Sequence, residues 1–292
     1  MIKEIADGVF AETDTRGCNP GFVVTSEGVV VIDTPQLPAS AVRMRKQAER
    51  HGPIRYLINT EHHVDHIFGN FFFNGAGTVV AHRRVLEQFM VVYPEINPFE
   101  YAKEAVPTSD PDDEALFPDK ENYFANMNKP TVTFEGDLKI GLGDTTFELI
   151  YTPGHTDGQI AVYIPERKVL FTGDTIFNGV QTWHYASNIE QWISSLRKLR
   201  KLDSKIVVPG HGPVCTMREI DTQISFLYEW LAAVSRCIVE GKSKEECVRS
   251  INFRERFSVD IGQEYMLDHV IEHNVSALYD KLNANDQIQG GT

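Results

Sequence analysis

The chain has 292 residues, with 28 Lys and Arg against 41 Asp and Glu, and its formal net charge is -13. This acidic balance repels phosphate backbones, so we expect no nucleic-acid partner. Hydrophobic residues make up 42% of the chain, which is typical of a globular protein. No apolar run approaches the roughly 18 residues that a membrane helix needs, so we expect no membrane span.

The N-terminus and the cysteines indicate a cytoplasmic protein. Acidic residues occur within residues 1–7, where a secretory signal peptide would need an apolar stretch. The cysteines show no CxxC spacing, which suits reduced thiols, and none has the setting of a metal ligand. They are Cys18, Cys215, Cys237 and Cys247.

The first sixty residues predict a β-hairpin, a helix and a further strand. Short apolar runs at residues 21–25 and 29–33 flank a Ser-Glu-Gly turn, which is the pattern of an antiparallel hairpin. Residues 39–51 have a helical pattern that a Gly-Pro pair ends. The next strand is predicted at residues 56–59, and it leads directly into a loop.

That loop carries a dense group of possible metal ligands. Residues 61–66 hold three imidazoles and two carboxylates, from Glu61, His62, His63, Asp65 and His66. Imidazole and carboxylate are ligands of Zn²⁺, Fe²⁺ and Mn²⁺, and no structural role needs such a density of them. The sequence therefore predicts a metal site on the loop after this strand.

Residues 90–130 break the periodic pattern and are rich in Pro, Asp, Asn and aromatic residues. A connection of this length is usually functional. Two interpretations stay open, a lid with an aromatic lining over the metal cleft and a surface insertion. The aromatic and Met residues concerned are Tyr93, Phe99, Tyr101, Phe117, Tyr123, Phe124 and Met127.

The second half repeats the plan of strands followed by ligand-type residues. Strands are predicted at 147–152, 160–164, 169–172 and 206–208, with a helix at 188–202. Alternating strands and helices favour sheets flanked by helices, with the ligands at one end of the strands. The later ligand-type residues are His155, Asp174 and His211.

A polar and aromatic group follows Asp174 and is expected to reach the cleft and bind substrate. It consists of Asn178, Trp183, His184 and Tyr185. We divide the chain into a catalytic domain at residues 1–218 and a helical extension at 219–292 that packs on the same domain. The apolar pattern of this extension leaves a homodimer open.

One motif in the extension competes with the metal cluster. His269 to His273 spells the H-x-x-E-H of inverted zinc peptidases, with the two imidazoles one helical turn apart. Such a site needs a third, acidic ligand from a later helix, and only Asp280 and Asp286 follow. We interpret the motif as chance or as a helix face packed near the cleft.

Taken in order, these motifs resemble the metallo-β-lactamase superfamily, whose hallmark is His-x-His-x-Asp-His followed by a lone His, an Asp and a final His. The resemblance covers roughly residues 19–213, and Asn19 to Phe22 and Ile32 to Thr34 also look like family members. It implies an α/β fold, a four-layered αββα sandwich, with the helical C-terminal extension added to it.

The resemblance also implies a ligand set for two ions. His63, Asp65 and His66 match the third, fifth and sixth hallmark positions, and the later ligands match His155, Asp174 and His211. The first position is Glu61 instead of His, whereas His62 occupies a variable position and is not expected to be a ligand. The second site, formed by Asp65, His66 and His211, is intact.

The Glu61 departure changes the charge of the expected site. Two divalent ions with two Asp carboxylates and a hydroxide leave a charge near +1, and a bound Glu61 lowers it to about zero. A carboxylate also favours harder ions. We therefore expect Zn²⁺, in two sites, with Mn²⁺ or Fe²⁺ as alternatives at the Glu61 site.

The expected activity is that of a metal-dependent hydrolase. Coordination lowers the pKa of water from 15.7 toward about 7, so a metal-bound hydroxide would be the nucleophile, oriented by Asp65. The expected substrate is a small, neutral or aromatic molecule with an ester, lactone, amide or other activated bond. Two alternatives stay open: an iron-dependent oxidoreductase of the same fold, persulfide dioxygenase-like or diiron, and a non-catalytic metal-binding sensor.

Overall fold

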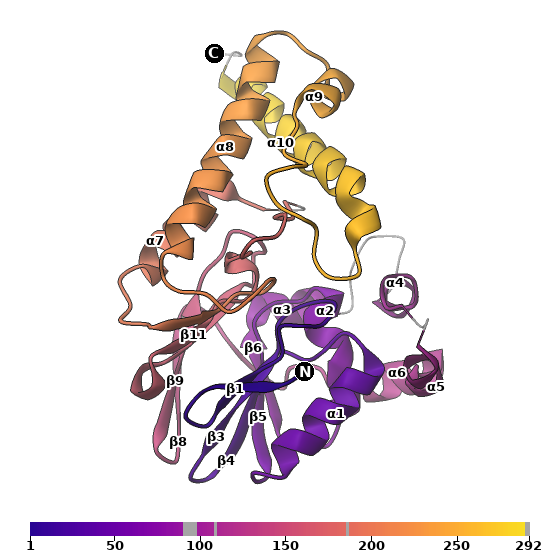
Figure 1. Cartoon of the computed structure of the whole chain (residues 1–292), viewed down its shortest axis with the longest axis vertical. Coiled ribbons are helices and arrows are strands. Elements are labelled where there is room, and N and C mark those ends of the chain that lie inside the picture. The colour runs from indigo at the N-terminus through magenta and orange to yellow at the C-terminus, as the bar shows by residue number, and fades with distance from the viewer. Residues whose placement is uncertain (90–97, 108–109, 185–186, 290–292) are drawn as a thin grey trace.

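Two β-sheets lie face to face at the centre of the molecule (Figure 1). The computed structural model describes residues 1–89, 98–107, 110–184 and 187–289. The first sheet has its strands in chain order, antiparallel from β1 to β4 and parallel from β4 to β7. They are β1 (Lys3–Ala6), β2 (Val9–Ala11), β3 (Gly21–Thr25), β4 (Gly28–Ile32), β5 (Ile54–Asn59), β6 (Thr78–His82) and β7 (Val132–Phe134).

The second sheet is antiparallel except at one edge. Its order is β12-β11-β10-β9-β8, and only β11 and β12 run parallel. The strands are β8 (Leu138–Leu142), β9 (Thr145–Tyr151), β10 (Ile160–Ile164), β11 (Val169–Phe171) and β12 (Ile206–Val208). The sequence predicted β10 and β12 with these bounds, because each is a short apolar run between turns.

The hairpin predicted near the N-terminus is formed by β3 and β4. Their register pairs Gly21 with Ile32 and Thr25 with Gly28. Gly28 has a φ of 133°, which a residue with a side chain rarely adopts. All residues of β4 are buried, as expected of a strand that is covered on both faces.

Apolar side chains from both sheets fill the space between them. Val30, Ile58 and Val80 of the first sheet belong to one buried cluster with Phe147 and Phe171 of the second. Each such side chain contributes about 1.5–3 kcal/mol on burial. This cluster is the core that holds the two sheets together.

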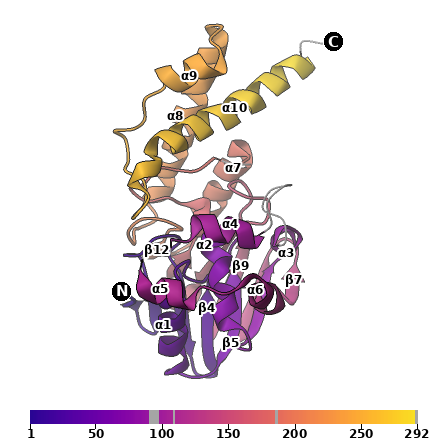
Figure 2. The same cartoon turned by 90° about the vertical axis from the view of Figure 1, so that its right-hand side faces the viewer.

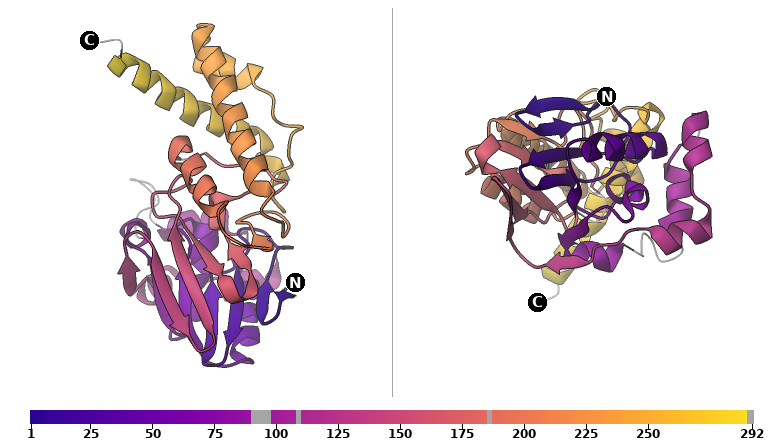
Figure 3. Two further views of the ribbon diagram at one scale, coloured as in Figure 1. Left: turned by 90° about the vertical axis from the view of Figure 1, so that its left-hand side faces the viewer. Right: turned by 90° about the horizontal axis from the view of Figure 1, so that it is seen from below.

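Helices cover the two outer faces and complete a four-layered αββα sandwich, as predicted (Figures 1 and 3). On the first sheet, Met44 of α1 and Phe73 of η1 pack against Leu57. On the second, Trp192 of α7 packs in one cluster with Leu170. These helices are α1 (Pro38–Glu49), η1 (Phe68–Phe73) and α7 (Ile189–Leu199).

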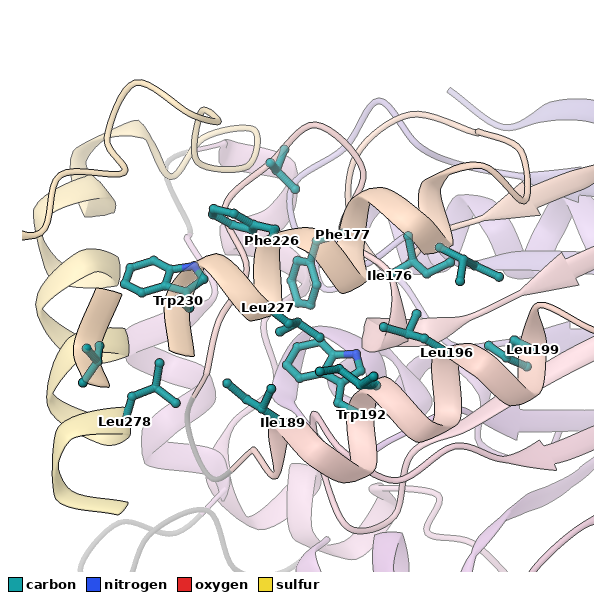
Figure 4. Packing of buried hydrophobic residues seen from close by; sticks show 14 of the residues in the cluster. Ile176, Phe177, Ile189, Trp192, Leu196, Leu199, Phe226, Leu227, Trp230 and Leu278 are labelled. Atoms are coloured by element: carbon teal, nitrogen blue, oxygen red, sulfur yellow. The ribbon is translucent and has the colours of Figure 1, made fainter. Parts of the chain in front are cut away.

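The C-terminal extension stands on one end of the sandwich, above α2 (Val64–Ile67) and α4 (Pro98–Ala105) (Figure 2). It contains α8 (Glu219–Val239), α9 (Lys244–Ser250), η4 (Glu264–Met266) and α10 (Leu267–Gln289). Trp230 and Leu278 of the extension share a buried cluster with Trp192 of α7 (Figure 4). Within the described ranges, no helix combines the length and the apolar character needed to cross a bilayer.

The insertion at residues 90–130 is only partly a cleft wall. Its described helices are α4, α5 (Pro111–Leu116) and α6 (Lys120–Asn126), whereas Tyr93 lies outside the described residues. Phe99, Tyr123 and Met127 are buried against Phe68 of η1 instead of facing the cleft. The interpretation as an aromatic lining is therefore corrected for these residues, because they form a core of their own, and among the described rings of this group Tyr101 lines the cleft.

The remaining short helices connect these layers. They are α3 (Arg83–Gln88), η2 (Pro165–Arg167) and η3 (Gly173–Thr175).

Candidate metal centre

Loops that follow four strands meet at one end of the sandwich. The loop after β5 is fixed by a reciprocal pair of amide hydrogen bonds between Asn59 and Asn70, at 2.8 and 3.1 Å. It is also tied to the second sheet, because the backbone N–H of Ile160 donates to the carbonyl oxygen of Thr60 at 2.9 Å. This cross-link brings residues 61–66 beside the loops after β9, β11 and β12.

The turn after β12 is held in place by Asn19, a residue near the N-terminus. The side-chain amide of Asn19 donates to the carbonyl oxygens of Pro209 and Gly212, at 2.9 and 2.7 Å. His211 lies in this turn, between Gly210 and Gly212, and its ring stacks on that of Phe177 with centroids 5.2 Å apart. Asn19 therefore fixes the position from which His211 enters the site.

The first donor set consists of Glu61, His63, His155 and Asp174. His63 Nδ1 lies 2.8 Å from Glu61 Oε2 and 3.3 Å from His155 Nε2. His155 Nε2 lies 3.3 Å from Asp174 Oδ2. These residues come from three separate loops and are brought together only by the fold.

The second donor set consists of Asp65, His66 and His211. His211 Nε2 lies 3.2 Å from Asp65 Oδ2. Asp174 contacts both His211 and His66 of this set. Asp174 Oδ1 lies 3.1 Å from His66 Nε2 and 3.4 Å from His211 Nε2. The two oxygens of Asp174 therefore face different donor sets, which is the position of a bridging carboxylate.

Three hydrogen bonds fix the imidazole orientations. His66 Nδ1 donates to Asp33 Oδ2 at 3.0 Å, and His211 Nδ1 donates to Asp260 Oδ2 at 2.6 Å. His155 Nδ1 donates to the carbonyl oxygen of Trp183 at 3.0 Å. Each bond turns Nε2 toward the cluster, which is how metal-binding histidines are oriented.

The arrangement fits a divalent metal. In a tetrahedral site with bonds of about 2.0–2.1 Å, neighbouring donors lie about 3.3 Å apart. The donor spacings above are close to this value. Among the described residues, buried Glu61 Oε1 and Oε2, His66 Nε2 and Asp174 Oδ1 have no hydrogen-bond partner, which a bound ion would supply.

The carboxylates are ionised at neutral pH, as metal binding requires. Burial by itself would raise their pKa values, but the neighbouring imidazoles outweigh it. The pKa of Asp65 falls to about 2 beside His66 and His211. The pKa of Glu61 is lowered by His63, and that of Asp174 lies well below its ordinary value because of His211 and His66.

Two neighbouring side chains stay outside the donor sets. Burial, followed by the charge of His63, lowers the pKa of His62 to about 3, so its ring is neutral, and it lines the cleft. Burial raises the pKa of the Cys18 thiol to about 12. Because a thiol binds metal as the thiolate, Cys18 is a poor ligand although it lies beside Asp33 and His66.

The donor sets lie at the base of a cleft of about 680 Å³. One wall comes from the insertion, with Tyr101 and Glu104. The opposite wall comes from Trp183 and the C-terminal extension, including Tyr265 and Met266. A cleft of this volume suits a small molecule.

The structure separates the four residues predicted to bind substrate. Trp183 lines the cleft. His184 does not: its side chain is 1% exposed, between Trp192 and Trp230, so the prediction for it is corrected. Asn178 is corrected too, because its amide donates to the carbonyl oxygen of Pro213 at 2.8 Å, away from the cleft lining. Tyr185 lies outside the described residues.

The H-x-x-E-H motif forms a helix face at the cleft. His269 and His273 of α10 both line it, with ring centroids 6.0 Å apart. His269 also lies 6.2 Å from the ring of Trp183. Among the described residues neither belongs to a group of three metal ligands. Of the two interpretations, chance or a helix face packed near the cleft, the second therefore describes this helix.

Sequence reasoning missed two residues that orient ligands. Asp33 directly follows β4, so its place at a strand end was a usable signal. Asp260 lies in the extension, 49 residues after its partner His211, and no local pattern marks it.

Three comparisons relate the chain to known proteins. A sequence model of the family described as Metallo-beta-lactamase superfamily matches residues 13–211. The chain is 27% identical over 248 residues to the 2,4-dinitroanisole O-demethylase subunit alpha of Nocardioides sp. (strain JS1661), across 82% of this chain and 62% of that protein. It is 26% identical over 187 residues to a hydroxyacylglutathione hydrolase of Thermosynechococcus vestitus, across 61% of this chain and 60% of that one.

The chain thus spans about six-tenths of the length of these two curated relatives. Among solved structures, a metallo-beta-lactamase from Pontibacter korlensis superposes with a TM-score of 0.57 at 19% identity. That superposition covers 78% of this chain and 98% of the other, and it shows a shared fold.

Proposed function

Because this chain belongs to the metallo-β-lactamase superfamily, we propose that it is a metal-dependent hydrolase of small, neutral, aromatic molecules that carry an ester, lactone, amide or other activated bond. One observation carries the proposal. The two donor sets, drawn from loops after four strands, meet at the base of an open cleft with their ligand atoms facing one another. Glu61, His63, His155 and Asp174 would hold one divalent ion, and Asp65, His66 and His211 with Asp174 the other.

Bound metal ions and the side chains of the chain would have different roles in the reaction. Bound divalent ions act as Lewis acids and lower the pKa of water from 15.7 toward about 7. Asp65 stays ionised, with its pKa at about 2, and can accept a hydrogen bond from the attacking water. Asp33, Asp260 and the Trp183 carbonyl hold the imidazoles in place, so the donor geometry is formed before substrate arrives.

The charges of the cleft favour a neutral substrate. The cations that line it within the described residues are Arg16 and Arg84, and both have partners. Arg16 donates to the carbonyl oxygen of Gly262 at 2.7 Å, and Arg84 pairs with Glu87 at 3.0 Å. Glu104 and Asp157 add negative charge to the lining. An anionic substrate would therefore find little attraction outside the metal centre.

The shape and the lining of the cleft favour an aromatic substrate. Trp183 and His269 present two rings beside the metal centre, and Met266 is a polarisable side chain on the same wall. The name of the Nocardioides relative includes 2,4-dinitroanisole, a neutral aromatic ether, which accords with this lining.

Metal exchange together with a substrate panel tests the proposal. The full chain is stripped with a chelator, reloaded with Zn²⁺ or Mn²⁺, and assayed on 4-nitrophenyl acetate, 2,4-dinitroanisole and S-lactoylglutathione. We expect hydrolysis of a neutral aromatic substrate that is lost on stripping, restored on reloading and absent in Asp174→Asn. Equal rates before and after stripping would refute metal dependence. Turnover of the anionic thioester alone would refute the substrate class and leave the hydrolase.

Glu61 favours one second candidate, an iron-dependent oxidoreductase of the same fold, because a buried carboxylate in the donor set suits Fe²⁺. Iron analysis and oxygen consumption with glutathione persulfide test it. Iron-dependent oxygen uptake without hydrolysis of the panel above would favour this candidate over the hydrolase.

A further inference from the structure

Glu61 stands where the resemblance leads us to expect a His, and its side chain is fully buried among the ligand-type residues. Neither carboxylate oxygen has a hydrogen-bond partner within the described part of the chain. A buried carboxylate without hydrogen bonds is costly unless a cation compensates it. The position of its two oxygens therefore indicates where cations would bind.

The two oxygens of Glu61 are placed differently. Oε2 lies 2.8 Å from Nδ1 of His63, a donor of the first set. Oε1 lies between the two sets, 3.4 Å from Nε2 of His66 in the second and 3.6 Å from Nε2 of His155 in the first. The oxygens of Asp174 reach the same two sets, with Oδ2 at 3.3 Å from His155 and Oδ1 at 3.1 Å from His66.

We propose that Glu61 is a second bridging carboxylate, which binds one ion through each oxygen and lies beside the Asp174 bridge. The spacing of Oε1 from His66 is close to the roughly 3.3 Å between neighbouring ligands of one ion. An imidazole at this position could not act in this way, because it directs a single nitrogen into the site. The inference rests on the proposed function only in taking the cluster as a metal centre.

Two consequences follow from a second bridge. The two ions share two carboxylates, so binding of the first ion holds both bridges in place for the second. The additional negative charge also favours ions that prefer oxygen ligands, such as Mn²⁺ and Fe²⁺. The two binding steps are therefore coupled through Glu61, and a change at Glu61 affects both.

Stepwise binding of Mn²⁺ to the metal-free full chain tests this role. Titration calorimetry and chelator competition give one affinity for each step, without any assay of activity. We expect Glu61→Gln to weaken both steps by about ten-fold or more, and we expect the same of Asp174→Asn. His63→Ala, which removes a ligand of the first set alone, should weaken mainly one step. Paramagnetic resonance of the parent with two Mn²⁺ bound should show coupled ions, and Glu61→Gln, which keeps the Asp174 bridge, should weaken the coupling.

Glu61→His separates a bridge from a ligand of one ion. This variant places at residue 61 the His that the resemblance leads us to expect. If Glu61 binds one ion only, His can replace it, and both affinities should equal those of the parent. If Glu61 bridges the two ions, His can replace only one of its contacts, and one binding step should stay weaker than in the parent. Glu12→Gln is the matched control, because Glu12 is equally buried but pairs with Arg43 at 3.2 Å, and it should bind Mn²⁺ as the parent does.

Each outcome separates this inference from the proposed function. If Glu61→Gln weakens a single step, or Glu61→His recovers both, the bridge is refuted whether or not the protein is a hydrolase. If the parent binds two coupled ions through Glu61 but cleaves nothing in the panel, the hydrolase fails and the bridge stands. If the parent binds neither Mn²⁺ nor Zn²⁺, both are refuted. Circular dichroism and melting of the metal-free variants exclude misfolding as the cause.

Discussion

Asp260 accepts a hydrogen bond from Nδ1 of His211, with 2.6 Å between the nitrogen and Oδ2. The two residues come from different parts of the chain, because His211 follows β12 and Asp260 precedes α10 in the extension. The extension therefore completes the metal centre as well as one cleft wall. Its helices were predicted from the sequence, but its part in the chemistry was not.

Removal of this carboxylate should weaken the second metal site. In Asp260→Ala, His211 loses the partner that orients its ring, and we expect a loss of about 10- to 100-fold in affinity for Zn²⁺ at one step. Chelator competition measures it. Asp268→Asn is the control, because Asp268 pairs with Arg254 on the surface of the same extension. An unchanged affinity in Asp260→Ala would show that the hydrogen bond has no orienting role.

Gly210 must lack a side chain because it lies against Asp174. A Cβ at this position would overlap Oδ1 of Asp174, the oxygen that faces the second donor set. We expect Gly210→Ala to displace Asp174 and to lower the affinity for both ions. Gly141→Ala is the matched control, since a Cβ there would meet nothing within 4 Å. Metal titration of both variants checks the prediction, and parent-like binding by Gly210→Ala would contradict it.

His184 should make the protein sensitive to acid. Burial lowers its pKa from 6.5 to about 3, so below pH 6.5 the unfolded chain takes up a proton that the folded chain does not. Its contribution to stability is therefore full above pH 6.5 and falls as the pH drops toward 3. Between pH 7.5 and 5.5 this loss is on the order of 1 kcal/mol.

His184→Phe tests this titration. The variant keeps an aromatic ring beside Trp192 and Trp230, and a phenyl ring does not titrate. We expect the stability of the variant relative to the parent to increase, on the order of 1 kcal/mol, from pH 7.5 to 5.5. Urea unfolding in the presence of a chelator measures it, so that loss of metal does not contribute. Parallel pH profiles of the two proteins would show that His184 is not the titrating group.

Trp183 should contribute to substrate binding through its side chain alone. Its carbonyl oxygen holds His155 and stays in place in Trp183→Ala, so the metal centre is retained. Loss of one aromatic contact of about 0.5–1.5 kcal/mol should raise KM for 4-nitrophenyl acetate about two- to ten-fold, with kcat little changed. Tyr228→Ala on the outer surface of α8 is the control. A change in kcat without a change in KM would place Trp183 outside the substrate site.

Much of the fold could be predicted from the sequence, because strands and their following turns are local patterns. The strands β10 and β12 and the hairpin of β3 and β4 occur where the apolar runs predicted them. The insertion was harder to interpret. Its aromatic residues were consistent with a lid and with a surface insertion, and their packing against Phe68 into a core was visible only in the structure.

The amino-acid sequence by itself determined which side chains carry metal-binding chemistry and that they follow strands, since ligand type and strand ends are both local properties. Only the tertiary structure decided which way each side chain points and which distant segment meets it. Consecutive residues of an extended segment point to opposite sides, so Trp183 faces the cleft while His184 is buried. Asp260 reaches His211 only because α8 and α10 pack across the end of the sandwich.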